Sequence, residues 1–89
     1  MIKNEQHDKE VRKASDAIRT VLAQNVLRFR RSKGLSQEEL ANMCGLHRTY
    51  IGSIERHERN VTLSTLEVIA ATLSISVPEL LTKKAANGE

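Results

Sequence analysis

The sequence predicts an all-α fold, a single bundle of five helices that begins with a long one. Apolar residues recur at steps of three and four along most of the chain, which is the periodicity of an amphipathic helix. No segment alternates apolar and polar residues for long enough to form a strand, and the chain contains one proline. The capping-box pattern, a serine followed three residues later by a glutamate, occurs at three expected helix starts: Ser36 with Glu39, Ser64 with Glu67, and Ser76 with Glu79.

Composition limits the size and class of the protein. Its 89 residues suffice for one domain, and because only 2% are aromatic, the core must be built from Leu, Ile, Val and Ala. A core this small is often supplemented by a partner subunit. Cys44, the single cysteine, excludes an intrachain disulfide and a cysteine-rich metal site, and we expect it in the core. Without an apolar run of about 18 residues or an apolar N-terminus, we expect a cytoplasmic protein that has no membrane partner.

The net charge of +3 is unevenly distributed. Between positions 11 and 33, Asp16 is the one acidic residue. The basic residues there are Arg12, Lys13, Arg19, Arg28, Arg30, Arg31 and Lys33. A basic stripe favours a polyanionic partner, although a solvated helix face also explains several of these residues.

The first helix is predicted from its apolar stripe and ends before Gly34. Its apolar positions are Val11, Ala14, Ile18, Val21 or Leu22, Val26 and Phe29. Asp8 and Ser15 are both acceptable caps for its start. We therefore expect residues 1–10 to be a flexible extension, residues 11–83 to form the domain, and residues 84–89 to be a flexible tail.

The next two helices have the spacing of a helix-turn-helix unit. One starts at Gln37 after its cap, and a small residue at Ala41 allows a close helix crossing. Gly45 follows four residues later, where the chain must leave the helix in a left-handed conformation. Ile51 and Ile54 then form the buried face of a helix that starts just after His47, holds residues 48–50 in its first turn, and runs to about His57. Such a unit presents its second helix to the DNA major groove, whereas an ordinary helical hairpin is the alternative.

Two further helices complete the bundle. Ser64 is predicted to cap a helix that runs through Leu73, and Ser76 to cap a last helix with Pro78 in its first turn. The last helix carries three apolar residues that we expect to bury area across the axis of a homodimer: Val77, Leu80 and Leu81.

These motifs resemble the phage-repressor type of helix-turn-helix, the family of the lambda and 434 repressors and of the xenobiotic-response-element regulators. The resemblance covers Val21 to Leu81 and rests on Phe29-Arg30, Gly34 to Ala41, Gly45-Leu46, and Ile51 through Arg56. A narrower resemblance, to the controller proteins of restriction–modification systems, lies in Arg48 to Ile51, Ile54 to Arg56, and Arg59 to Leu63. Those controllers are small homodimers that time expression of the endonuclease, and the segment before Val21 departs from the family pattern.

Four residues of the third helix are candidates for reading DNA bases. An arginine at position 48 can donate two hydrogen bonds to guanine, which discriminates between bases by ~1–3 kcal/mol, or it can contact a phosphate instead. Thr49 offers a hydroxyl or a methyl group, or only starts the helix. Tyr50 either faces the groove or folds against the core. Ser53 lies one turn after Thr49, and Gly52 beside it indicates that another group approaches closely.

Phosphate contacts are expected at the edges of the unit. Gln37, at the helix start, can hold a phosphate together with free backbone N–H groups, or it is an ordinary first-turn glutamine. Arg56, Arg59 and Asn60 lie at or just beyond the end of the third helix and are expected to contact the DNA backbone.

The family resemblance implies a different role for one arginine and one glutamate. In repressor-type domains an arginine four residues before the glycine that ends the first helix pairs with a glutamate late in the third helix. Arg30 and Glu55 occupy those positions and are expected to form a structural ion pair rather than to contact DNA.

Taken together, the sequence predicts a transcription regulator that binds double-stranded DNA as a homodimer on a near-palindromic operator. An antitoxin or protein-interaction module with the same fold is the alternative. If the protein activates transcription, then Glu38, Glu39 or Glu58 could contact RNA polymerase. An enzyme is not expected, because the chain lacks a phosphate-binding glycine loop, a nucleophile with its base, and paired carboxylates. No cofactor or metal site is predicted, since His47 and His57 are ten residues apart without other zinc ligands at a suitable spacing.

Overall fold

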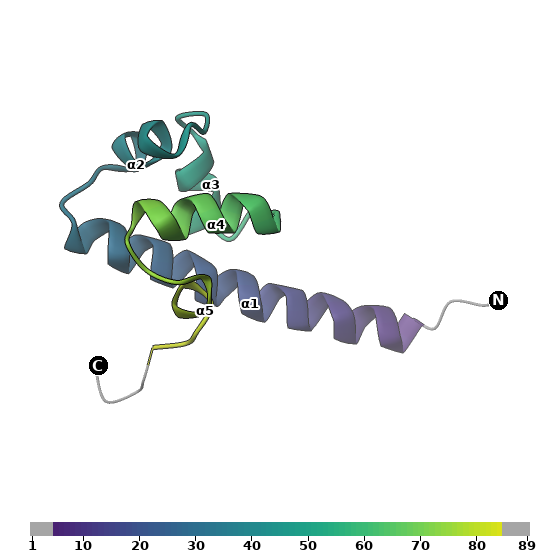
Figure 1. Cartoon of the computed structure of the whole chain (residues 1–89). Helices are drawn as coiled ribbons and strands as arrows, with labels where there is room; N and C mark the ends of the chain where they lie inside the picture. The colour runs from purple at the N-terminus through teal and green to yellow at the C-terminus, as the bar shows by residue number, and fades with distance from the viewer. Residues whose placement is uncertain (1–4, 85–89) are drawn as a thin grey trace.

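Five helices and no strand make up residues 5–84, the part of the chain that the computed structural model describes, with side chains from Asp16 onward (Figure 1). The helices are α1 (Glu5–Ser32), α2 (Gln37–Cys44), α3 (Tyr50–Glu55), α4 (Leu63–Thr72) and α5 (Val77–Leu80). The all-α prediction is thus confirmed for this range. No helix in it combines the length and the apolar character needed to cross a membrane.

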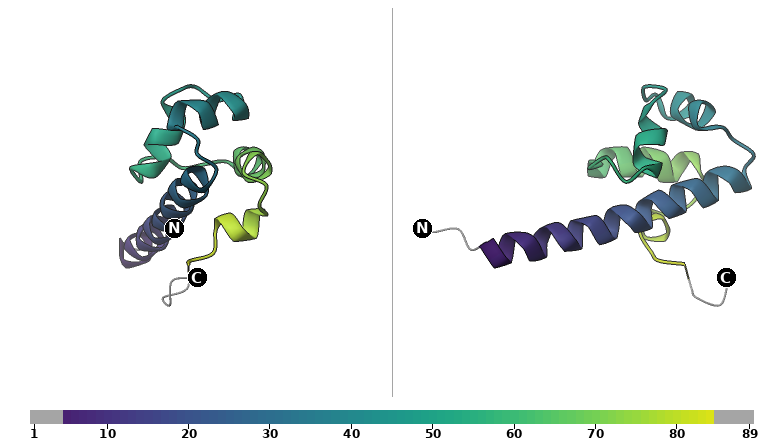
Figure 2. Two further views of the ribbon diagram at one scale, coloured as in Figure 1. Left: turned by 90° about the vertical axis from the view of Figure 1, so that its left-hand side faces the viewer. Right: turned by 180° about the vertical axis from the view of Figure 1, so that it is seen from behind.

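One apolar core holds these helices together. α1 packs against α3 and α5, α2 packs against α3 and α4, and α4 packs against α5. The buried residues of the core are aliphatic, as the composition predicts: Leu22, Val26, Leu40, Ala41, Ile51, Ile54, Leu66, Ile69, Ala70, Leu73 and Leu80. As a result α2 lies at one end of the molecule and α5 at the other, and α1 and α4 pass between them (Figure 2).

The first helix is longer than predicted. α1 begins at Glu5, and not at a cap provided by Asp8 or Ser15, so the expected boundary at residue 10 falls inside the helix. Its N-terminal half extends beyond the other helices (Figures 1 and 2). Its C-terminal end is as predicted, because Gly34 adopts a φ of 68° and the N–H of Leu35 bonds to the carbonyl of Arg30. Residues 1–4 and 85–89, which belong to the expected flexible ends, lie outside the described range.

α2 begins and ends as its sequence indicates. The Ser36 side chain accepts a bond from the Glu39 N–H, and the Glu39 carboxylate accepts one from the Ser36 N–H. At the other end Gly45 has a φ of 70°, a conformation that costs other residues more than glycine. Cys44 is only partly buried, and its thiol lies 3.5 Å from the Thr72 hydroxyl. It therefore lies at the edge of the core instead of inside it.

α3 is shorter than predicted at both ends. Arg48 and Thr49 lie in a turn that precedes it, and Tyr50 is its first residue. The His47 ring accepts a hydrogen bond from the Thr49 N–H at 3.2 Å. A side chain therefore stabilises this turn, and the spacing of apolar residues in the sequence does not reveal such a contact. After Glu55 the chain leaves the helix, and His57 adopts a left-handed conformation with φ 65°.

The capping prediction for α4 is wrong by two residues. Thr62, not Ser64, is the cap, and its hydroxyl accepts a bond from the Thr65 N–H. Ser64 lies inside the first turn of the helix. Both residues are suitable caps, and the extended backbone of Thr62, with ψ 160°, decides between them.

α5 is a single turn that a buried asparagine holds against α1. Its predicted capping box between Ser76 and Glu79 is confirmed. The Asn25 amide nitrogen donates to the carbonyls of Leu80 and Thr82, at 2.8 and 2.9 Å. Leu80 is fully buried in the core of its own chain, which rules out its predicted role in a dimer interface. Val77 and Leu81 remain partly exposed.

We predict that Asn25→Ala lowers the free energy of unfolding by about 1–3 kcal/mol, since it leaves carbonyls at the end of α5 without their donor. Urea denaturation followed by circular dichroism measures this change. The control is Asn42→Ala, which removes an exposed asparagine of α2 and should change stability by less than about 0.5 kcal/mol. Equal effects of the two substitutions would contradict this role of Asn25.

Candidate nucleic-acid interface

A polar hollow of about 370 Å³ opens between the start of α2 and the segment that contains α3. It is lined by Gln37, Glu38, Arg48, Thr49, Gly52 and Arg56. These residues belong to α2, to α3 and to the residues that flank α3, and the two helices meet because Leu40, Ala41, Ile51 and Ile54 share one core. Four of the residues that the sequence predicts to contact DNA phosphates or bases are therefore brought together on one surface: Gln37, Arg48, Thr49 and Arg56.

Beneath the hollow, one carboxylate joins three helices. The Arg30 guanidinium donates to both Glu55 oxygens, at 2.7 and 3.0 Å, so the ion pair that the resemblance implies is present. Both side chains are about nine-tenths buried. The Gln37 amide donates to Glu55 Oε1 at 2.8 Å. Arg30 on α1, Glu55 on α3 and Gln37 on α2 thus form one network, in which Arg30 also donates to the Leu35 carbonyl.

Hydrogen bonds favour the charged forms of two side chains in this region, Arg30 and Glu39. The bond from the Arg30 guanidinium to Glu55 raises the pKa of Arg30 above its ordinary value, so Arg30 remains protonated. The backbone N–H of Ser36 donates to the Glu39 carboxylate and lowers the pKa of Glu39. Glu39 therefore stays ionised at the start of α2, where a negative charge is favourable.

Arg48 and Thr49 lie on the exposed rim of the hollow. Their position in the turn before α3, rather than within it, leaves both side chains at the N-terminal end of the helix. The Thr49 hydroxyl lies 2.8 Å from His47 Nδ1. Arg48 therefore has the greater freedom to reach a ligand, whereas Thr49 is held by its neighbour.

Ser53 is buried, contrary to the prediction that it faces the DNA-binding surface. It is only 8% exposed, its hydroxyl donates to the Tyr50 carbonyl at 2.6 Å, and its oxygen accepts a bond from Arg59 Nε at 2.7 Å. The Arg59 guanidinium also lies 4.1 Å from the centre of the Tyr50 ring. Arg59, Tyr50 and Ser53 therefore hold one another, and the Ser53 hydroxyl is engaged within the chain both as a donor and as an acceptor instead of being free to contact a base.

The three residues expected to contact the DNA backbone near the end of α3 do not all line the hollow. Arg56 is exposed, pairs with Glu58 at 3.2 Å and lines the hollow. Asn60 instead accepts a hydrogen bond from the Arg19 guanidinium of α1. Asn60 and Arg59 line a different pocket from Gln37 and Arg48, and both are engaged by other residues of the chain, Asn60 by Arg19 and Arg59 by Ser53.

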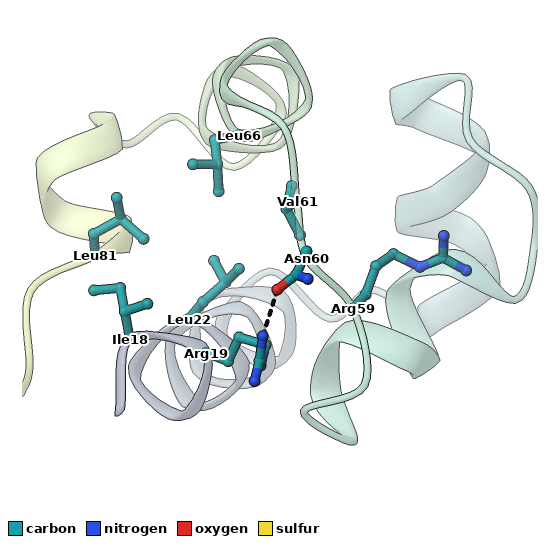
Figure 3. A pocket seen from close by; sticks show the side chains of 8 residues that line it. All are labelled: Ile18, Arg19, Leu22, Arg59, Asn60, Val61, Leu66 and Leu81. Atoms are coloured by element: carbon teal, nitrogen blue, oxygen red, sulfur yellow. Dashed lines mark hydrogen bonds between the residues drawn. The ribbon is translucent and has the colours of Figure 1, made fainter. Parts of the chain in front are cut away.

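That second pocket is small and mostly apolar. It has a volume of about 160 Å³ and lies between α1, α4, α5 and the segment that precedes α4 (Figure 3). Its lining residues are Ile18, Arg19, Leu22, Arg59, Asn60, Val61, Leu66 and Leu81. Ile18 is 44% exposed at its edge, and Leu81 is partly exposed. Apolar surface on this side is therefore open to solvent in the single chain.

Known proteins share the helix-turn-helix arrangement seen in α2 and α3. A family model for helix-turn-helix proteins matches residues 26–80, a range that begins in the second half of α1 and ends with α5. The chain belongs to the helix-turn-helix family. Control protein C.SmaI of Serratia marcescens is 57% identical over 72 residues, which are 81% of this chain and 86% of that protein.

Two solved structures share the fold of this helix-turn-helix protein. The restriction-modification controller protein C.AhdI of Aeromonas hydrophila is 42% identical, with a TM-score of 0.68 over 72% of this chain and 97% of that one. SinR, a master regulator for biofilm formation solved in complex with DNA, is 37% identical, with a TM-score of 0.65 over 68% of this chain and 98% of that one. In this chain α2 and α3 form the helix-turn-helix unit.

The link between Gln37 and Glu55 was not predicted from the sequence. The two residues are far apart along the chain, and a glutamine at a helix start carries no signal of its partner. The glycine in α3 was the one available hint, because Gly52 lies directly under the Gln37 side chain.

We predict that Glu55→Gln lowers the free energy of unfolding by about 3 kcal/mol, because it leaves the buried Arg30 guanidinium without a charged partner. Chemical denaturation at neutral pH measures the loss. Glu58→Gln is the matched control: it removes an exposed carboxylate whose pair with Arg56 should contribute less than about 1 kcal/mol. If both variants unfold at the same urea concentration as the wild type, the network does not stabilise the fold.

Proposed function

We propose that this protein is a sequence-specific transcription regulator that binds operator DNA as a homodimer, and that it is the controller of a restriction–modification system. The observation that carries the proposal is the convergence of Gln37, Arg48 and Arg56 on one exposed hollow between the start of α2 and the residues that flank α3. The similarity to C.SmaI and C.AhdI supports the controller role. With DNA as its partner, the protein would act in the cytoplasm, and no enzymatic activity is proposed.

The contacts that we propose follow from what each side chain can still reach. Arg48 is exposed and can present its planar guanidinium to a guanine edge. Gln37 lies beside the backbone N–H groups at the start of α2, a favourable site for a phosphate. Arg56 supplies a positive charge on the same rim and would orient the protein on the DNA backbone. Thr49 is an additional candidate for a base contact, whereas Ser53, Arg59 and Asn60 are left out because they do not line the hollow.

RNA polymerase is a proposed second partner if the protein activates transcription. Of the three acidic residues considered, Glu39 is held in its capping box and Glu58 pairs with Arg56. Glu38 is exposed on the rim of the hollow. We therefore assign such a contact to Glu38.

The homodimer is proposed to use the end of the molecule that carries α5. Leu81 and Ile18 border the half-open apolar pocket, and Val77 is partly exposed on the same short helix. A second copy covering these residues would remove apolar area from water, which a small core favours. Two-fold symmetric helix-turn-helix dimers place their recognition helices about 34 Å apart, so the operator should be a near-palindrome.

Selection of bound sequences from random duplex DNA tests the proposed function. We expect a near-palindromic consensus with half-site centres separated by about one turn of DNA. Recovery of no consensus, with affinity equal to that for unrelated DNA, would contradict sequence-specific regulation and favour a protein-interaction module.

A base-reading role for Arg48 predicts that Arg48→Ala relaxes the preference at one position in each half-site, at a cost of ~1–3 kcal/mol per site. Arg56→Ala should instead weaken binding to all sequences alike. It should also reduce the slope of log affinity against log salt by roughly 0.9 per lost contact in each subunit. Affinities for the operator and its single-base variants, measured at several salt concentrations, separate the two roles. If Arg48→Ala weakened binding to all sequences alike, Arg48 would contact a phosphate and not read a base.

The dimer proposal predicts that Leu81→Asp shifts the protein toward the mass of one chain, because it introduces a charge into an apolar contact. Light scattering at micromolar concentration measures the mass. Met43→Asp, at an exposed methionine of α2, is the control and should leave the dimer intact. A wild-type mass of one chain, or equal behaviour of the two variants, would count against this surface.

A further inference from the structure

Gly52 lies at a position where a glycine is unfavourable. It occupies the middle of α3, where alanine would stabilise the helix by roughly 1 kcal/mol. Unlike Gly34 and Gly45, it does not have a positive φ, so its backbone does not require a glycine. The reason for a glycine here must therefore be space rather than conformation.

The space above Gly52 is occupied by the ends of two side chains from different elements. A Cβ atom at this position would lie 3.1 Å from Gln37 Oε1 and 3.1 Å from Arg56 Nη1. Both distances are shorter than ordinary van der Waals contact, so the neighbours would have to move by a few tenths of an ångström. By contrast, a Cβ at Gly34 or Gly45 would meet nothing within 4 Å.

We propose that Gly52 is a positioning residue for DNA binding: its missing side chain allows Gln37 and Arg56 to converge over α3. The proposal rests on the function proposed above, in which both side chains contact DNA phosphates. Gly52 itself touches no ligand in this account. It sets how deeply the two side chains lie in the hollow and leaves Gln37 within reach of Glu55.

The geometry predicts that Gly52→Ala weakens binding without lowering stability. The two groups displaced by a methyl group are the far ends of flexible, exposed side chains, so the fold can accommodate Gly52→Ala. The bond from Gln37 to Glu55, however, is 2.8 Å long and leaves little room for a shift. Displacement of Gln37 and Arg56 would move both phosphate contacts at once, while Arg48 stays in place to read bases.

The test is a set of Gly52→Ala variants in three backgrounds: wild type, Gln37→Ala, and Gln37→Ala with Arg56→Ala. In the wild-type background we expect an unchanged circular dichroism spectrum and no fall in melting temperature. We expect affinity for the selected operator to fall by about tenfold or more. The loss should be the same for the operator and its single-base variants, because base preference depends on Arg48. In the background that lacks both side chains, Gly52→Ala should have no effect on binding.

Three results would overturn the proposal. The first is an affinity of Gly52→Ala equal to that of wild type, and the second is a loss of the same size in all three backgrounds. The third is a fall in melting temperature, because that would assign Gly52 to the fold rather than to the hollow.

A measurement without DNA separates this inference from the proposed function. The side-chain amide resonances of Gln37 report its bond to Glu55 by NMR, and we expect them to shift in Gly52→Ala. If the protein selects no operator but these resonances shift, the proposed function is wrong, while the role of Gly52 in placing the Gln37 side chain stands. If they do not shift, the positioning role is wrong whatever the protein binds.

Discussion

The carboxylate of Glu55 is the point on which the arrangement of the helix-turn-helix unit depends. It accepts two hydrogen bonds from Arg30 on α1 and one from Gln37 on α2, and its own backbone belongs to α3. Apolar packing brings these helices into contact but does not by itself fix their relative positions, because it is not directional. The hydrogen bonds at Glu55 are directional, and a buried charge that lost its partner would be costly. The surface proposed to contact DNA is therefore built on an internal ion pair.

The polar residues of α3 and its surroundings fall into two groups. One group, with Gln37, Arg48 and Arg56, opens onto the hollow. The other, with Tyr50, Ser53 and Arg59, is tied together by hydrogen bonds and a cation–π contact against the core. A short helix of six residues thus has little freely exposed surface of its own, and much of the proposed DNA contact comes from the turn before it and from α2.

Patterns that depend on local chemistry were predictable from the sequence, whereas side-chain partners far apart in the chain were not. The capping box at Ser36 and the left-handed Gly45 follow from neighbouring residues, and both are present. The cap of α4 was misplaced because Ser64 and Thr62 are chemically equivalent candidates, and only the backbone path distinguishes them. The exposure of Ser53 was misjudged because helical spacing does not reveal Arg59, which returns from the following loop to cover it. Leu80 was assigned to a dimer for a similar reason: an apolar residue near a terminus has the same pattern whether it packs within the chain or against a partner.

NMR titration of the protein with its selected operator locates the DNA-binding surface, because backbone and side-chain resonances respond to contacts at individual residues. We expect the largest changes at Arg48, Thr49, Arg56 and the Gln37 side-chain amide. The Arg59 Nε–H resonance, which reports the bond to Ser53, should remain close to its position in the free protein. The largest changes at Arg59, Ser53 and Asn60, with Arg48 and Gln37 unperturbed, would contradict the assignment of the hollow as the DNA-binding surface.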